Sequence, residues 1–249
     1  MEVRMDDFEE RLDGNVAGVW RVGDTVRRVA GPWTPSVHAL LEHAGPRLTA
    51  VPRVLGFDER GREVLTYLPG RVVNIDVEML SSGQIRSIVE WTRSFHVAVG
   101  DFDPGGPWRF DEVAEPTMIG HNDIAPYNVC FEGDDLVGVF DWDLAGPTTP
   151  LLEIAFIAWN CVPLWAEIGR ELAAERLQLI ASVYGSYSAL EILHAVPTRI
   201  EIMLEWIPKA ALAGDDGIVH LMSLGEPERS RRSLDDLLGR LPAIAALLP

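Results

Sequence analysis

The residues best suited to chemistry lie near the middle of the chain. The stretch 121–128 reads His-Asn-Asp-Ile-Ala-Pro-Tyr-Asn, and Asp141-Trp142-Asp143 begins thirteen residues after Asn128. Between them, apolar β-forming residues flank an acidic turn that contains glycine, which predicts a hairpin. In such a hairpin the start of the first strand lies beside the end of the second. Asn128 and Asp141 are therefore expected to be neighbours, with Asp123 on the entering loop.

This grouping of side chains suits two kinds of chemistry. The oxygen atoms of Asn128 and Asp141 are ligands that Mg²⁺, a hard cation, accepts readily. The carboxylate of Asp123 is suited to orienting an attacking hydroxyl group. The alternative is a set of solvated loop acids with a turn asparagine, but the joint spacing and the hairpin favour function.

The pattern His-x-Asp-x-x-x-x-Asn followed by Asp-Trp-Asp resembles the aminoglycoside phosphotransferase family, which has a protein-kinase-like fold. The resemblance implies that Asp123 is the catalytic aspartate. It also implies that Asn128 and Asp141 are the two metal ligands.

Further residues carry the same resemblance. Gly146 and the run 150–155 match the family's glycine and its Asp-Leu-Ala stretch, with Glu153 in place of the aspartate. The match is dense over 118–156 and weak but collinear elsewhere. The run 22–34 also resembles a bacterial subgroup labelled with trifolitoxin immunity.

The expected fold class is α+β, with a small β-rich N-lobe and a larger, mainly helical C-lobe. We predict an N-lobe over 1–66 that covers the nucleotide and a hinge over 67–72. The C-lobe, 73–249, would carry the catalytic hairpin and the acceptor site. A cleft between lobes is a common place for small ligands.

Local patterns support this division. Short β-rich runs at 16–21 and 25–29 flank a Gly-Asp turn, and runs at 54–57 and 63–67 form a second hairpin. A short helix is expected over 36–43. Helical periodicity dominates after Ser81, with an apolar face over 85–96 and helices at 171–184, 188–193, 199–213 and 233–248.

A nucleotide needs a cation from the small lobe, and the family usually supplies a lysine on the third strand. The only lysine here is Lys209, far downstream. The matching position is Arg28, whose guanidinium can bind phosphate in a bidentate way. Val26 shares its face of the strand and could touch the base. The alternative is a solvated strand-end arginine, as Arg27 could be.

Other nucleotide contacts follow from the resemblance alone. Gly14, Asn15 and Gly18 lie where a loop would cover the phosphates, although glycines at this spacing are also common in hairpins. Backbone groups of Thr66 and Leu68 would hydrogen-bond the purine, unless this segment is an ordinary linker.

Kinases hold the phosphate-binding cation with a glutamate on the following helix. Here no acidic residue occurs between Thr25 and Leu41, and Val37 or His38 occupies the expected place. Either phosphate binding is weakened or another acid of the fold supplies the partner.

The remaining polar residues near the motif are expected to support it. His121 and Glu153 would brace the catalytic loop, and Trp142 would pack in the core. Asp143 either assists at the metal or caps the turn.

No acceptor-binding residue can be assigned from the sequence. Glu201 and Glu205 lie one helical turn apart, and Asp215 and Asp216 lie in a predicted loop. A solvated surface is the favoured interpretation for all of them.

Composition limits the choice of partners. The 249 residues are 47% hydrophobic with a net charge of −17, which argues against nucleic acid and anionic membranes. This charge is compatible with a cationic substrate, although solubility is the favoured explanation.

Cys130 and Cys161 are expected to be buried thiols. Neither 1–11 nor 154–165 resembles a signal or a membrane span, so a cytoplasmic monomer or weak homodimer is expected.

We therefore predict an ATP-dependent enzyme, with GTP possible, that uses Mg²⁺ and phosphorylates a hydroxyl group of a small molecule. Aminoglycosides, other antibiotics, amino alcohols and sugars all remain open as acceptors. The alternative is a non-catalytic protein of the same fold that sequesters a toxin, an antibiotic or a nucleotide. A metal-binding or scaffolding role without nucleotide is a weaker rival.

Overall fold

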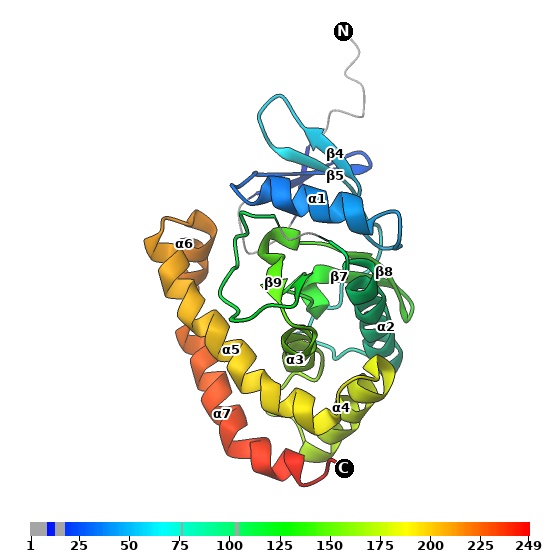
Figure 1. Ribbon diagram of the computed structural model, residues 1–249, viewed down its shortest axis with the longest axis vertical. Helices are drawn as coiled ribbons and strands as arrows, with labels where there is room; N and C mark the ends of the chain where they lie inside the picture. The colour runs from blue at the N-terminus through cyan, green and yellow to red at the C-terminus, as the bar shows by residue number, and fades with distance from the viewer. Residues whose placement is uncertain (1–8, 13–17, 76, 103–104) are drawn as a thin grey trace.

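The first part of the chain forms an antiparallel sheet with one helix against it (Figure 1). The computed structural model describes residues 9–12, 18–75, 77–102 and 105–249. The helix α1 (Thr34–Ala44) lies between the sheet and the rest of the molecule. The strand order is β1-β2-β3-β5-β4, with β1 (Glu10–Leu12), β2 (Val19–Val22), β3 (Thr25–Arg28), β4 (Val54–Phe57) and β5 (Glu63–Thr66).

Both predicted hairpins of this region are present. Strands β2 and β3 pair from Val19–Arg28 to Val22–Thr25 around Gly23, whose φ of +58° suits a residue without a Cβ. Strands β4 and β5 form the second hairpin. The short strand β1 was not predicted, and the start of the run 16–21 lies outside the described residues.

The second part of the chain is mainly helical and contains two small antiparallel pairs of strands. One pair joins β6 (Met118–Gly120) with β9 (Gly146–Thr148), and the other joins β7 (Val129–Glu132) with β8 (Asp135–Val139). In the described residues, the α-helices of this part are α2 (Ser82–Ala98), α3 (Pro150–Cys161), α4 (Arg170–Tyr184), α5 (Ala189–Leu212), α6 (Asp216–Ser223) and α7 (Glu228–Ala245).

The hydrophobic core runs through both parts. It reaches from Leu40 and Leu41 on α1, through Ile88 on α2, to Ile157 on α3 and Leu193 on α5. Cys130 and Cys161 are buried thiols, as predicted. The chain is thus an α+β protein with a small sheet lobe and a larger helical lobe.

The helix α5 corrects the prediction of two helices, 188–193 and 199–213. It is one continuous helix that includes Pro197. Proline removes one backbone hydrogen bond, but the buried face on both sides of it, including Val196 and Ile200, packs into the core and keeps the helix intact. The helix α6 was not predicted.

No single helix in the described residues is both long and apolar enough to cross a membrane. Helices α4 and α5 meet that test only as a pair, and they are bent by 102° at their junction.

Candidate functional site

The hairpin of β7 and β8 places the predicted metal ligands at its open end. Asn128 ends the short helix η2 (Pro126–Asn128) directly before β7, and Asp141 directly precedes η3 (Trp142–Leu144) after β8. The amide of Phe140 donates to the carbonyl of Asn128 at 3.0 Å. The local pattern of strand, turn and strand therefore brings these two ends together, as the sequence predicts.

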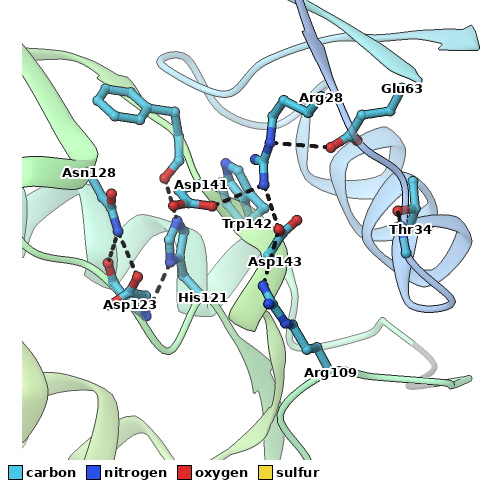
Figure 2. Close-up of polar contacts among 12 residues, drawn as sticks. Arg28, Thr34, Glu63, Arg109, His121, Asp123, Asn128, Asp141, Trp142 and Asp143 are labelled. Carbon is cyan, nitrogen blue, oxygen red and sulfur yellow. Dashed lines mark hydrogen bonds and ion pairs between the residues drawn. The ribbon is translucent and has the colours of Figure 1, made fainter. Parts of the chain in front are cut away.

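Asp123 lies against Asn128. The Asn128 side-chain amide donates to the Asp123 carboxylate at 2.8 Å and to its carbonyl at 3.0 Å. The hydroxyl group of Tyr127 lies 3.5 Å from the other carboxylate oxygen. Figure 2 shows Asp123, Asn128 and Asp141 gathered around His121. The three residues predicted to act together are therefore close in space.

The environment of Asp123 favours its neutral form in the absence of ligands. Burial raises the pKa of Asp123 to about 8, and the negative charge of Asp141 acts in the same direction. The charge of Arg199 and the hydrogen bond from Asn128 oppose this shift. A positive charge that offsets Asp141 would lower the pKa of Asp123 again.

Arg28 reaches the same place from β3 of the small lobe (Figure 2). Its guanidinium lies 3.1 Å from Asp141, 2.6 Å from Asp143 and 3.5 Å from Glu63. Burial by itself lowers the pKa of Arg28, but the three carboxylates outweigh this effect and raise the pKa above its ordinary value. Arg28 therefore stays charged and joins the two lobes.

Glu63 is the acid that the sequence analysis could not locate. It lies on β5, directly across from Arg28 in the sheet register, and its side chain is only 3% exposed. His38 on α1 contacts the other Glu63 oxygen at 3.1 Å. The helix position expected for a glutamate thus holds a histidine, which positions a carboxylate supplied by the neighbouring strand.

Asp143 and Asp215 are both engaged by Arg109, a residue that the sequence analysis did not single out. Arg109 lies 3.3 Å from Asp143 and makes two hydrogen bonds of 2.7 Å to Asp215. Asp215 also accepts a hydrogen bond from the Ile218 amide, as the N-cap of α6. The prediction of a solvated Asp215 was wrong because α6 folds this loop back against the site. Glu201, Glu205 and Asp216 are exposed.

The loop before Asp123 is held by Glu153 and His121, as predicted. Glu153, buried at the start of α3, accepts hydrogen bonds from the amides of His121 at 2.6 Å and Asn122 at 2.9 Å. The His121 ring contacts the Phe140 carbonyl at 3.1 Å and accepts from the Asp123 amide. Burial lowers the pKa of His121, which favours the neutral ring that these contacts require. Trp142 is buried against this ring.

The backbone at this site is unusual in two places. Asn122 has a φ of +64° and Asp141 a φ of +62°. Left-handed conformations are uncommon for residues other than glycine and are tolerated best by Asn and Asp. Such conformations cluster at functional sites, and these two occur in the loops that carry Asp123 and Asp141.

Arg199 on α5 is a further residue that sequence reasoning missed. It is fully buried, donates to the Asn122 carbonyl at 2.7 Å, and lies over the rings of Phe110 and Phe156. Burial lowers the pKa of Arg199 to about 10, against the charges of Asp123 and Glu153. Its position within an amphipathic helix gave no signal that its side chain points into the core.

For the predicted nucleotide contacts other than Arg28, the structure shows only local surroundings. Gly14 and Asn15 lie outside the described residues. A Cβ on Gly18 would lie 2.2 Å from the Trp20 ring, so its missing side chain makes room for this indole. The Thr66 amide donates to the backbone carbonyl of Arg53. Val26 is half-buried on β3. The remaining backbone groups of Thr66 and Leu68 stay predicted purine contacts.

The donor set fits a magnesium ion. Both Asn128 contacts with Asp123 use its amide nitrogen, so its amide oxygen is available as a ligand. The Asp141 side chain is 42% exposed. Among the described residues, no group of three or more His, Cys, Asp or Glu side chains is arranged around a metal position. Mg²⁺ typically takes one or two protein ligands together with water and phosphate oxygens.

Comparison with known proteins agrees with this geometry. Residues 104–190 match the model of the phosphotransferase enzyme family. The trifolitoxin immunity protein of Rhizobium leguminosarum bv. trifolii is 33% identical over 175 residues, which cover 67% of this chain and 65% of that protein. These matches confirm the predicted resemblance to the phosphotransferase enzyme family. The chain spans 65% of the length of the immunity protein that it matches.

Solved structures show the fold of this chain. A choline/ethanolamine kinase family protein from Mesorhizobium loti matches with a TM-score of 0.60 and 16% identity, over 96% of this chain and 88% of that one. A complex of an aminoglycoside 2′-phosphotransferase-IIIa mutant with GDP matches with a TM-score of 0.59 and 14% identity, over 96% and 94% of the two chains. The predicted kinase-like fold is therefore confirmed.

Proposed function

We propose that this protein transfers the γ-phosphoryl group of ATP to a hydroxyl group of a small molecule. The observation that carries the proposal is the ion pair between Arg28 of one lobe and Asp141 of the other, beside the hydrogen-bonded Asp123 and Asn128. The fold it shares with an aminoglycoside phosphotransferase and a choline/ethanolamine kinase family protein supports this function. GTP is the alternative donor, since one of these structures holds GDP.

In this mechanism Asn128 and Asp141 would hold Mg²⁺, which neutralises charge on the phosphates when it is bound. Arg28 binds phosphate oxygens and is kept in place by Glu63. Asp123 orients the acceptor hydroxyl and takes its proton late in the transfer. Catalysis is then mainly positioning and electrostatic stabilisation.

The test is ADP release from ATP and Mg²⁺ with a panel of aminoglycosides, amino alcohols and sugars. Asp123→Asn should lower turnover by about 10²- to 10⁴-fold, the usual contribution of a positioned general base. It should leave nucleotide binding in place, whereas Asp141→Asn should weaken nucleotide binding. Glu201→Gln, a change at an exposed carboxylate, is the control. Normal turnover by the Asp123 variant would remove its assigned role.

A second candidate is sequestration without catalysis. The 33% identical relative is an immunity protein, and an immunity function can be served by binding alone. In addition, Arg28 is already paired with three carboxylates, which weakens its attraction for phosphate. Saturable binding of a panel compound without ADP release would favour this candidate over the phosphotransferase.

A further inference from the structure

Arg109 joins three parts of the molecule that are far apart in the sequence. Its guanidinium lies 4.5 Å from the ring centroid of Trp33, directly before α1 in the small lobe. It also binds Asp215 at the start of α6 and Asp143 in η3. Its side chain is only 8% exposed. Arginine is rarely buried unless it is paired, so this position is built around specific partners. Figure 2 shows one of them, Asp143, beside Arg109.

The backbone next to Arg109 is held equally firmly. Phe110 is fully buried, and its ring packs edge-on against Trp206 of α5. A Cβ on Gly146 would lie 2.2 Å from the Phe110 carbonyl oxygen, so this segment lies directly on β9. Arg109 is therefore presented to its partners from a fixed backbone.

The Asp143 carboxylate is shared between two arginines. A single oxygen of Asp143 lies 2.6 Å from Arg28 and 3.3 Å from Arg109. The two positive groups face more negative charge than they can neutralise. The cluster sets four carboxylates against two guanidinium groups, namely Glu63, Asp141, Asp143 and Asp215 against Arg28 and Arg109.

We propose that Arg109 is a positioning residue for phosphate binding. By sharing the Asp143 carboxylate, it keeps part of the Arg28 charge available to a nucleotide phosphate. Without Arg109, the Asp143 carboxylate would pair with Arg28 alone. The electrostatic attraction between Arg28 and a nucleotide phosphate would then be weaker. The inference rests on the proposed function, because it requires a nucleotide at Arg28.

A purely structural role for Arg109 leads to different expectations. In that case Arg109 would only tether α6 through Asp215. Asp215→Asn would then reproduce the effect of losing Arg109, and changes at Asp143 would not compensate for it. If Arg109 instead acts by sharing the Asp143 carboxylate with Arg28, the charge of Asp143 determines how much nucleotide affinity is lost when Arg109 is replaced.

The experiment is isothermal titration calorimetry of the full chain with Mg²⁺ and a non-hydrolysable ATP analogue. Arg109→Gln should weaken binding by about tenfold, as expected for altering a close charge network. Adding Asp143→Asn to that variant should restore the affinity to within about threefold of the original. Lys209→Gln removes one positive charge from an exposed pair with Glu112 and should leave the affinity unchanged.

Several outcomes would overturn the inference. Equal affinity of Arg109→Gln and the original protein would do so, as would a loss that Asp143→Asn fails to restore while Asp215→Asn reproduces it. If Arg109→Gln does not fold, Asp143→Asn alone decides: its affinity should equal or exceed that of the original protein, and weaker binding contradicts the inference. Absence of nucleotide binding by the unmodified protein would reject the proposed function itself, and this inference with it.

Discussion

Arg28 illustrates how one residue's role depends on a partner from a different element than expected. Its cross-strand neighbour Glu63 supplies the negative charge, and His38 on α1 holds the second Glu63 oxygen. The helix α1 thus contributes a hydrogen bond to Glu63, whereas the sequence analysis looked for an acidic residue on this helix. The pairing of β3 with β5 skips over α1 and β4, so no local pattern in the sequence could reveal this contact.

Removing the Glu63 charge should destabilise the protein. We expect Glu63→Gln to lower the free energy of unfolding by about 3 kcal/mol, because it removes one partner of the buried ion pair between Glu63 and Arg28. Urea unfolding followed by tryptophan fluorescence measures this change. Glu59→Gln, at an exposed position in the same hairpin, should be neutral. A change below about 1 kcal/mol for Glu63→Gln would mean that Asp141 and Asp143 suffice for Arg28.

For single residues of the site, the sequence was informative only where the spacing along the chain determines which side chains lie close together. Asp123 and Asn128 lie five residues apart on one loop, and a single hairpin adds Asp141, so all three could be predicted. Arg109 and Arg199 approach from segments without any distinguishing pattern. Their contacts arise because α5 brings Arg199 to the Asn122 carbonyl and the start of α6 brings Asp215 to Arg109.

Among the elements, those with local contacts were predicted best. The hairpin of β7 and β8 forms around Gly133, with a φ of +64° in its turn, and needs no distant partner. The pair of β6 and β9 joins segments more than twenty residues apart and escaped prediction. The short helix α6 depends on its Asp215 cap and on burial of Ile218, and neither could be judged from periodicity.

The start of α3 should make the loop before Asp123 sensitive to acid. Burial alone raises the pKa of Glu153, but His96 and the Asn122 amide outweigh burial and hold the pKa below its ordinary value of 4.5. A carboxylate with a lowered pKa in the folded state contributes stability above its unfolded pKa. That contribution disappears as the pH falls through the lower, folded pKa.

We therefore expect Glu153→Gln to destabilise the protein at pH 7 by roughly 2 kcal/mol, the order of a hydrogen bond to a charged group. The difference from the original protein should shrink as the pH falls from 5 toward 3. Urea unfolding at a series of pH values tests this, with Glu201→Gln at an exposed position as the control. A difference that stays constant across this range would show that the ionised carboxylate is not what stabilises the loop.

For the molecule as a whole, the two lobes meet through charge and through backbone contacts. The Val139 amide donates to the Ala50 carbonyl at 2.9 Å, and the Trp91 indole donates to the Thr49 carbonyl at 3.0 Å. Arg28 adds its interlobe ion pairs. The fold class could be predicted from the succession of strands and helices. No acceptor-binding residue could be predicted, because which side chains of the helical part come together depends on how its helices pack.

The net charge of −17 leads to a prediction about stability that is independent of function. Self-repulsion of a strongly charged chain destabilises the compact state, and salt screens exposed charges more than buried pairs such as Arg28 with Glu63. Raising NaCl from about 20 mM to about 300 mM should therefore raise the melting temperature by roughly 2–4 °C, or about 1 kcal/mol for a chain of this length. Differential scanning calorimetry measures this change, and KCl should act equally if screening is the cause. A fall in melting temperature would instead mean that attractive ion pairs, including those between the lobes, outweigh the repulsion.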